Sequence, residues 1–167
     1  MVSNESYSRE RVLKILDQIT DPEIPVLRIT DLGIVREVET DGGQVRVTIT
    51  PTYSGCPAMD VISMQIKMEL LAAGFQQVEV IQQLAPAWTT DWMTERGKAQ
   101  LQQYGIAPPL PRQQVCTPDR FASEEAVSCP RCRSHHTHRI SEFGSTACKA
   151  LYQCDDCLEP FDYFKCH

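Results

Sequence analysis

The sequence predicts an α+β domain, a small mixed sheet with helices, followed by a four-cysteine ribbon. Two observations lead to this prediction: helical and strand-like periodicities alternate before residue 106, and two Cys-x-x-Cys pairs follow residue 128. A chain of 167 residues has room for one domain of about 100 residues and a small appendage. A proline-rich stretch separates the two parts. We therefore expect a first domain over residues 1–106, a linker over 107–127 and the ribbon over 128–167.

The first domain is expected to begin with an amphipathic helix over residues 8–20, because apolar residues recur there at helical spacing. Pro22 should end the helix, since proline disfavours helical geometry in the residue before it. Strands are expected over 34–40 and 44–50, joined by the turn Asp41-Gly42-Gly43. The clean alternation of the second strand predicts a β-hairpin with one buried face.

A second helix is expected to begin at Pro57, which suits the first helical position, and to stop at Gly74. Apolar residues at helical spacing form a stripe along it. The stripe consists of Val61, Met64, Met68 and Leu71, joined by Ile62 and Ile66. We interpret this stripe as packing into the core.

The last elements of the first domain are a strand over 77–84 and a helix over 94–104. Gly105 is a typical helix stop. Four prolines between residues 107 and 127 then punctuate a stretch with little periodicity, which is typical of a linker.

The two cysteine pairs are Cys129-Pro130-Arg131-Cys132 and Cys154-Asp155-Asp156-Cys157. Each pair places two thiols on one tight turn, so both sulfurs can face the same ion. Four thiolates around one point make a tetrahedral site that suits zinc or iron. The 21 residues between the pairs leave room for a small hairpin, although this gap lies just beyond the usual range. We therefore predict a structural metal bound by Cys129, Cys132, Cys154 and Cys157.

Further candidate ligands lie near these pairs. Cys148 and Cys166 could form a second metal site, or one of them could replace a cysteine of the two Cys-x-x-Cys pairs. The alternatives are that Cys148 is a packed thiol and that Cys166 belongs to a frayed terminus. His135, His136 and His138 also follow the first pair. Because four cysteines already complete one tetrahedral site, we expect these histidines to be solvated loop residues.

Charge and composition exclude several classes of function. The ribbon carries five basic and five acidic residues, and the net charge of −6 arises before residue 128. No basic face is therefore available for phosphates, and we expect no nucleic-acid partner. The chain lacks a signal peptide and any apolar run of the roughly 20 residues that a membrane span needs, so we expect a cytoplasmic protein without a membrane partner. In that reducing compartment, eight cysteines indicate metal ligands or reactive thiols.

Cys56 is the thiol of most interest in the first domain. It precedes a helix, where unpaired N–H groups and the helix dipole favour a thiolate. Asp21, Glu23 and Asp31 could approach it at one end of the sheet. The alternatives are a buried thiol at Cys56 and capping or turn formation by the carboxylates. No Ser-His-Asp arrangement, phosphate-binding glycine loop or carboxylate pair stands out, so we do not expect the chain to be an enzyme by itself.

Three segments of the first domain resemble the SufT-like iron–sulfur assembly proteins. They are Asp21-Pro22-Glu23-Ile24-Pro25, Thr30-Asp31-Leu32-Gly33-Ile34-Val35 and Thr52-Tyr53-Ser54-Gly55-Cys56-Pro57. The resemblance covers about residues 8–105. It implies that Cys56 handles iron or a cluster transiently, and it implies less strongly that Asp21, Glu23 and Asp31 are neighbours in this task.

The ribbon resembles the PaaD family, which belongs to bacterial phenylacetyl-CoA epoxidase systems. The similar segments lie at residues 140–150 and 159–167. The resemblance implies an accessory role in aerobic phenylacetate catabolism, with Zn²⁺ in the ribbon. The implied partners are a di-iron oxygenase and a reductase that carries a flavin and a [2Fe–2S] cluster. A homodimer is a further candidate assembly.

Three functions remain open at this point. In the first, which we favour, the chain matures an iron–sulfur or iron centre of the reductase or oxygenase, and the ribbon docks this client. In the second, iron in the four-cysteine site makes the chain a rubredoxin-like electron carrier, which zinc could not do. In the third, the chain is a non-catalytic scaffold component of the oxygenase complex.

Overall fold

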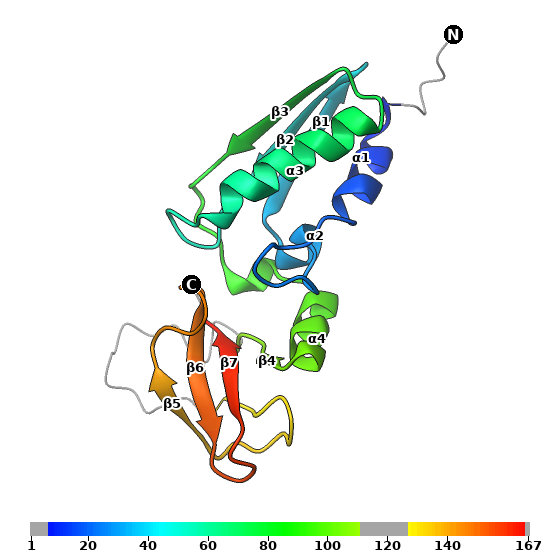
Figure 1. Ribbon diagram of the computed structural model, residues 1–167. Helices are drawn as coiled ribbons and strands as arrows, with labels where there is room; N and C mark the ends of the chain where they lie inside the picture. Colours follow the sequence, from blue (N-terminus) through cyan, green and yellow to red (C-terminus); the bar gives the residue numbers. More distant parts are fainter. Residues whose placement is uncertain (1–6, 111–126, 166–167) are drawn as a thin grey trace. The chain divides into compact units, whose positions relative to one another are not determined.

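The computed structural model describes residues 7–110 and 127–165. These residues form two compact units, the first ending at Trp88 and the second beginning at Thr89 (Figure 1). Each unit has its own sheet and is described by itself. Within the described ranges, no helix is long and apolar enough to span a membrane.

The first unit contains a mixed three-stranded sheet in the order β1-β2-β3. Strands β1 (Val35–Asp41) and β2 (Gln44–Ile49) form the predicted antiparallel hairpin. Strand β3 (Gln77–Gln82) runs parallel to β2, and helix α3 (Ala58–Ala72) makes the crossover that a parallel pair requires. This mixed sheet with its helices confirms the predicted fold class.

Helices α1 and α3 lie on the same face of this sheet (Figure 1). On β2 the side chains of Val45, Val47 and Ile49 are buried at alternate positions, as the pleat of a strand requires. Because α3 contributes Ile62 and Ile66 to the same core, the first unit is built as one helical layer on one sheet.

Helix α1 (Arg9–Leu16) begins at Ser8, whose hydroxyl accepts a hydrogen bond from the Arg11 amide at 3.3 Å. It ends earlier than the expected residue 20. After Asp17 the backbone makes i→i+3 turns and then an isolated antiparallel bridge between Thr20 and Arg28. The Asp17 carboxylate also accepts a 2.6 Å hydrogen bond from the Arg28 guanidinium. This ion pair fastens the end of α1 to the segment that follows the next loop.

A short helix, α2 (Ile29–Leu32), was not expected from the sequence. Its four residues are too few to show helical periodicity, and Gly33 ends it with a φ of 77°. The indole Nε1 of Trp88 donates a 3.0 Å hydrogen bond to the Leu32 carbonyl. This buried contact fixes the last residue of the first unit against α2.

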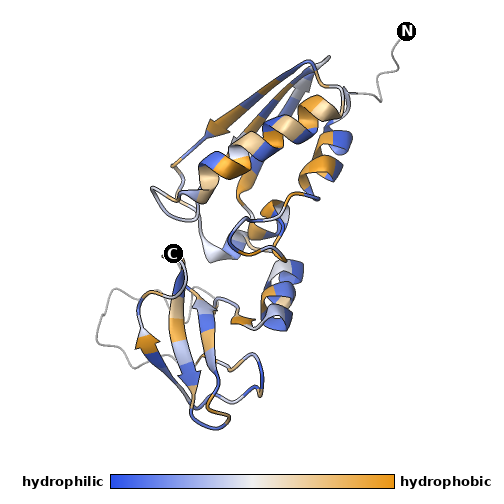
Figure 2. Ribbon diagram, in the orientation of Figure 1, coloured by the Kyte–Doolittle hydropathy of each residue, from blue (hydrophilic) through white to orange (hydrophobic). Residues whose placement is uncertain are grey.

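The apolar stripe of α3 faces solvent, so its assignment to the core is wrong. The buried side chains of α3 are those of Ala58, Met59, Ile62, Ile66 and Leu70. Val61, Met64, Met68 and Leu71 are instead 49–64 % exposed. The helix is apolar on both sides (Figure 2), and the sheet can cover only one of them. The sheet covers Ile62 and Ile66, the two residues that we described as joining the stripe.

The second unit begins with a 3-10 turn, η2 (Thr90–Trp92), and helix α4 (Glu95–Tyr104). The Thr94 hydroxyl caps α4 by accepting from the Gly97 amide at 3.0 Å, and Gly105 ends the helix at a φ of 95°, as predicted.

The sheet of the second unit has four strands in the order β4-β7-β6-β5. Strand β4 (Ile106–Ala107) runs parallel to β7 (Pro160–Phe164). Strands β5 (Thr137–Ser141) and β6 (Lys149–Cys154) complete it as antiparallel neighbours. Most of the expected linker lies outside the described residues, and the domain boundaries at 106 and 128 stay a prediction.

The core of the second unit is small and aromatic. Tyr152 stacks on Phe161 with ring centroids 6.0 Å apart and meets Tyr163 edge-on at 5.5 Å. The same buried cluster contains Cys129 and Cys154. The first cysteine of each pair is therefore held from inside the core, which positions the metal site described next.

Candidate functional site

The two cysteine pairs adopt the same turn. The residue after each pair, Arg133 or Leu158, has a positive φ of 65° or 62°, which side chains other than glycine rarely adopt. The first cysteine of each pair donates its backbone N–H to the carbonyl five residues on: Cys129 to Ser134 at 2.8 Å and Cys154 to Glu159 at 3.0 Å. The two turns thus present their sulfurs in equivalent ways.

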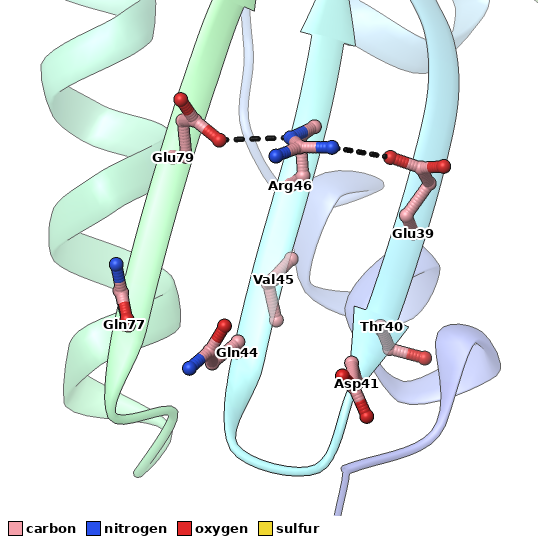
Figure 3. Close-up of a pocket in the computed structure, with 8 residues that line it drawn as sticks. All are labelled: Glu39, Thr40, Asp41, Gln44, Val45, Arg46, Gln77 and Glu79. Carbon is pink, nitrogen blue, oxygen red and sulfur yellow. Dashed lines mark hydrogen bonds and ion pairs between the residues drawn. The ribbon is translucent and has the colours of Figure 1, made fainter.

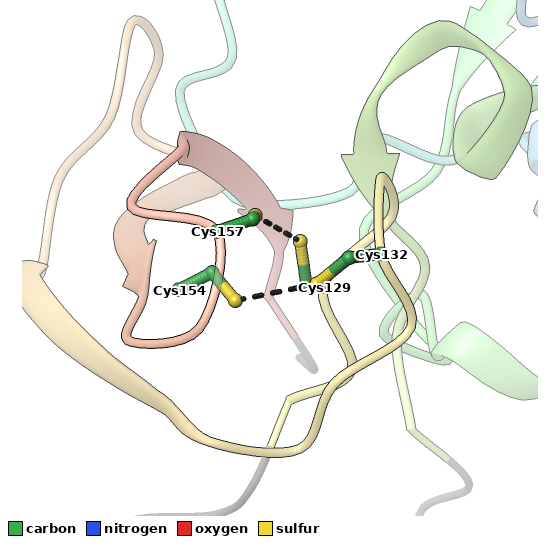
Figure 4. A group of neighbouring side chains, drawn as sticks. All are labelled: Cys129, Cys132, Cys154 and Cys157. Atoms are coloured by element: carbon green, nitrogen blue, oxygen red, sulfur yellow. Dashed lines mark hydrogen bonds between the residues drawn. The ribbon is translucent and has the colours of Figure 1, made fainter.

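The four sulfurs meet at one point between these turns (Figure 4). All four lie within 4.8 Å of one another. The Sγ atoms of Cys129 and Cys157 are 3.8 Å apart, and those of Cys132 and Cys154 are 3.5 Å apart. A tetrahedral site with Zn–S bonds of about 2.3 Å requires sulfur separations of about 3.8 Å. The donor set therefore fits a four-coordinate zinc ion.

Without a cation these thiols do not ionise together. Backbone N–H groups of Cys157 and Asp156 donate to the Cys154 sulfur and lower its pKa to about 7. The Ser134 amide donates to the Cys132 sulfur, which by itself lowers the pKa of Cys132. The sulfur of Cys154 and the other two sulfurs act in the opposite direction and raise this pKa to about 12. A divalent cation removes this conflict, because it stabilises all four thiolates at once.

Two of the histidines connect the turns. His138 Nδ1 lies 2.7 Å from an Asp155 carboxylate oxygen, and His136 Nδ1 lies 3.3 Å from one of Asp156. Both aspartates stand between the cysteines of the second pair. His136 is an exposed loop residue, as expected, whereas His138 lies in strand β5 and is only partly exposed. The two contacts connect the second cysteine turn with the segment that follows the first.

Cys148 lies apart from the four-sulfur group. It is buried just before β6, and its Sγ is 3.0 Å from the Thr146 hydroxyl. Cys166 lies outside the described residues. That either is an extra ligand stays a prediction.

Cys56 sits in the turn that leads from β2 into α3. Gly55 precedes it with a φ of 84°, a left-handed conformation that favours glycine. The Cys56 amide donates to the Tyr53 carbonyl at 3.3 Å, and its own carbonyl accepts from the Met59 amide at 3.3 Å. The half-buried thiol therefore stands directly before the first turn of α3.

A small pocket of about 240 Å³ opens beside this thiol. The β2–α3 turn lines one side of it, α3 contributes Met59 and Asp60, and Gln82 and Leu84 close it from the end of β3. Pockets for drug-sized organic ligands are about 300–1,000 Å³. The space at Cys56 suits an ion or another small group better than a large substrate.

Burial raises the pKa of the Cys56 thiol above its usual value of 9.0. Hydrogen bonds from the Ala58 amide and the Tyr53 hydroxyl act in the opposite direction, as expected at a helix start. The charges of Glu23 and Asp21 add to the increase. The expected preference for a thiolate is therefore wrong for the metal-free protein, in which Cys56 is a neutral thiol at pH 7.

The acidic neighbours differ in position. Asp21 is buried, and its Oδ1 accepts hydrogen bonds from the amides of Glu23 (2.8 Å) and Ile24 (2.9 Å). Asp21 thus stabilises the loop through these two hydrogen bonds. Its charge and that of Glu23 also raise the pKa of Cys56. Asp31 is buried in α2 and is not among the groups that shift the Cys56 pKa.

Another hollow, of about 400 Å³, lies on the first sheet (Figure 3). At its centre the Arg46 guanidinium contacts Glu79 at 2.8 Å and Glu39 at 3.2 Å, and these hydrogen bonds raise the pKa of Arg46. All three side chains are about half exposed. The arrangement links neighbouring strands and is typical of a sheet surface.

Two protein families match separate parts of the chain. Residues 9–81 match a family described as iron-sulfur cluster assembly protein. Residues 113–165 match the PaaD zinc beta ribbon domain. The first match contains Cys56 and the second contains all four knuckle cysteines. The four-cysteine cluster is accordingly a zinc-binding site.

A protein of Escherichia coli (strain K12), provisionally named as a component of 1,2-phenylacetyl-CoA epoxidase, is 55 % identical over 152 residues. The alignment covers 91 % of this chain and 89 % of that protein. The chain belongs to the PaaD family of phenylacetyl-CoA epoxidase components. As a PaaD family member, it combines the assembly domain and the zinc ribbon in one chain.

The assembly domain of this PaaD family member also has relatives that lack most of the second unit. "Fe-S protein maturation auxiliary factor" of Porphyromonas gingivalis is 33 % identical over 56 % of this chain and 90 % of its own length. The factor YitW of Bacillus subtilis, named likewise, is 33 % identical over 58 % and 96 %. The crystal structure of a domain of unknown function, DUF59, from Bacillus anthracis has a TM-score of 0.52 at 27 % identity, covering 55 % of this chain and 89 % of that one. These similarities indicate an accessory role related to iron–sulfur proteins.

Proposed function

We propose that this chain is an accessory protein of a phenylacetyl-CoA epoxidase system that matures an iron–sulfur or iron centre in the reductase or oxygenase. Cys56 holds the iron or cluster transiently as cargo, and the zinc ribbon recognises the client. The observation that carries this proposal is the division of labour between two thiol sites. One gathers four sulfurs that fit a structural zinc ion, and the other presents a single thiol beside a small open pocket.

The setting of Cys56 supports temporary binding. Soft thiolate ligands suit iron–sulfur chemistry, and one protein thiol leaves the remaining coordination positions open for the client's own ligands. Binding requires the thiol to lose its proton to solvent, because only the thiolate is a metal ligand. Since the pKa of Cys56 is raised, this proton competes with the metal at neutral pH and weakens the hold on the cargo.

The charges around Cys56 support a cation as cargo. Glu23 and Asp21 oppose ionisation of the thiol while no metal is present. The same two carboxylates attract a ferrous ion that approaches the pocket. The local field is therefore unfavourable for a bare thiolate and favourable for a thiolate bound to a cation.

The ribbon supports recognition more than chemistry. Zinc has no accessible redox change, so a zinc ribbon does not carry electrons, which argues against the rubredoxin-like alternative. Nor does the pocket at Cys56 have the volume expected for a coenzyme A ester. A role in which the chain acts on a partner protein, without turning over the organic substrate, accounts for both facts.

The test measures iron in the client. The reductase and oxygenase are purified from cells without this chain and from cells carrying the wild type, Cys56→Ala or Ser54→Ala. Ser54→Ala is the control, since it alters an exposed residue of the same turn and leaves the thiol. We expect the iron content of the client to fall in cells without the chain and in cells that carry Cys56→Ala. It should stay at the wild-type level in cells that carry Ser54→Ala. Full iron occupancy without the chain would exclude maturation; stable co-purification with the oxygenase in fixed stoichiometry would then indicate a scaffold component.

A further inference from the structure

The four sulfurs of the zinc site differ in their access to solvent. Cys129 and Cys154 are 0 % exposed, whereas Cys132 and Cys157 are exposed. Each turn therefore contributes one protected sulfur and one that a small molecule in solution can reach. Oxidation of cysteine follows exposure and thiolate character, and zinc keeps its sulfur ligands as thiolates. Two of the four ligands are thus open to an oxidant.

Two close sulfur contacts run from one turn to the other (Figure 4). The Sγ atoms of Cys132 and Cys154 are 3.5 Å apart, and those of Cys157 and Cys129 are 3.8 Å apart. Each contact joins an exposed sulfur of one turn to a buried sulfur of the other. An exposed sulfur that is oxidised therefore lies next to a protected thiolate that can resolve it.

We propose that the zinc ribbon is an oxidation site, at which peroxides convert the four thiolates into the disulfides Cys132–Cys154 and Cys129–Cys157 and displace the zinc ion. Both bonds form across the two turns. The proposal concerns the ribbon alone and holds whether or not Cys56 carries cargo.

The chemistry balances with hydrogen peroxide as the oxidant. The exposed thiolate attacks one peroxide oxygen and becomes a sulfenic acid, while the O–O bond breaks and the other oxygen leaves as water with a proton from solvent. The buried thiolate then attacks the sulfenic sulfur. An S–S bond forms, the S–O bond breaks, and that oxygen leaves as a second water with another proton. Each disulfide consumes one peroxide and two protons, and two disulfides leave zinc without a thiolate ligand.

The pairing decides what happens to the fold. An S–S bond measures about 2.05 Å, so each contact has to close by about 1.5–1.8 Å. Because both bonds join one turn to the other, they replace the ion as the link between the turns. Bonds within the pairs, Cys129–Cys132 and Cys154–Cys157, would leave the turns without a covalent link. We therefore expect the oxidised ribbon to keep its aromatic core after zinc has left.

Titration of the zinc-loaded full chain with hydrogen peroxide, without reductant, tests the proposal. A chromogenic chelator measures released zinc, and mass spectrometry maps the disulfides. Trypsin cleaves after Arg131, and an Asp-specific protease cleaves before Asp155 and Asp156, so the two cysteines of each pair fall on separate peptides. We expect complete loss of zinc and peptides joined across the turns. Zinc that stays bound in excess peroxide, or disulfides within each pair, overturns the proposal.

Reduction tests reversibility. A dithiol supplies the two electrons and two protons that each disulfide needs, so dithiothreitol with added Zn²⁺ should restore one zinc per chain. A permanent loss of zinc binding would mean that the sulfurs pass to sulfinic or sulfonic acids, which contradicts resolution by the buried thiolates.

Two controls separate this site from the other thiols. Cys148→Ser removes a buried sulfur outside the four-sulfur group and should release zinc like wild type. Zinc that this variant retains would make Cys148 the attacking thiol and overturn the proposal. Brief alkylation of the zinc-loaded chain should label Cys132 and Cys157 before Cys129 and Cys154. The reverse order would also overturn it.

NMR spectra test whether the disulfides replace zinc as the link. The peroxide-treated protein should keep the dispersed ring signals of Tyr152, Phe161 and Tyr163, which form the core beside the turns. Protein stripped of zinc by a chelator under reducing conditions has neither ion nor disulfides and should lose these signals. Loss of the signals in both samples contradicts pairing across the turns.

Discussion

The four-cysteine site and the Cys56 turn use the same ligand atom in opposite settings. In the ribbon, two turns of matching geometry bring four sulfurs within 4.8 Å of one another, and two of the cysteines are anchored in an aromatic core. Cys56 is one half-buried thiol in a single turn, and its nearest charges oppose its ionisation. Under the proposed function, the number of converging thiols would distinguish permanent metal binding in the ribbon from temporary binding at Cys56.

Removing a ligand from the closed site should have the largest effect. Cys154→Ser leaves three thiols, and structural zinc contributes roughly 10–16 kcal/mol to folding in small zinc domains. We expect loss of zinc and unfolding of the second unit, while the first unit, which ends at Trp88, keeps its structure. Zinc analysis and NMR spectra of the variant measure both effects.

Cys148→Ser is the control for this experiment, because its sulfur lies outside the four-sulfur group. It should retain one zinc per chain and a folded ribbon. Loss of zinc in the control would assign Cys148 to the metal site and weaken the contrast between the two regions.

The next effect concerns the open site. Cys56→Ala should abolish binding of Co²⁺, used as an absorbing probe for ferrous iron, to the zinc-loaded protein. The thermal unfolding midpoint should change little, because the thiol is only half buried. Zinc content should be unchanged. If the thiolate absorption band persists in the variant, the probe binds elsewhere and Cys56 is not the open site.

The pH dependence should separate the regions further. Because the pKa of Cys56 is raised above 9.0, the thiol is protonated at neutral pH and must release one proton on binding. The apparent affinity for Co²⁺ should therefore rise about tenfold per pH unit between about pH 6.5 and 8.5. Titrations at three pH values measure the slope. A flat profile would mean that Cys56 is already a thiolate.

The smallest expected effect tests the two roles of Asp21. Asp21→Asn keeps an oxygen for the amides of Glu23 and Ile24 but removes the charge, so the Cys56 pKa should fall with little loss of stability. Asp21→Ala also removes the acceptor and should cost about 1–3 kcal/mol in the free energy of unfolding. Thiol alkylation rates against pH and denaturant unfolding distinguish the two variants. Equal stability of both would show that the loop does not need these hydrogen bonds.

Local signals in the sequence were sufficient for the closed site and for the position of Cys56. The spacing of the cysteine pairs is short enough to fix their geometry, and Gly55 and Pro57 mark the turn before α3. The direction of the Cys56 pKa was not predictable, because burial and the charges of Glu23 and Asp21 arise only when distant segments meet. The sequence therefore predicts where the two thiol sites lie, whereas only the fold reveals the direction of the Cys56 pKa shift.

The apolar stripe of α3 was misassigned for a related reason. Periodicity identifies apolar faces, but α3 has two of them, and only the position of the sheet decides that Ile62 rather than Met64 is buried. Helix α2 and strand β4 were missed because four and two residues are too few to show a period.

The pairing of β4 with β7 has a practical consequence for anyone who isolates the ribbon. Ile106 and Ala107 complete the edge of the second sheet, and Ala107 belongs to its buried cluster. A fragment starting at Ser128 would keep every zinc ligand, but it would lack β4 and would expose the backbone of β7. We expect such a fragment to aggregate edge to edge, because an unpaired strand can pair with another chain. A fragment that begins near Thr89, ahead of α4, would include β4 and would keep the edge of β7 paired.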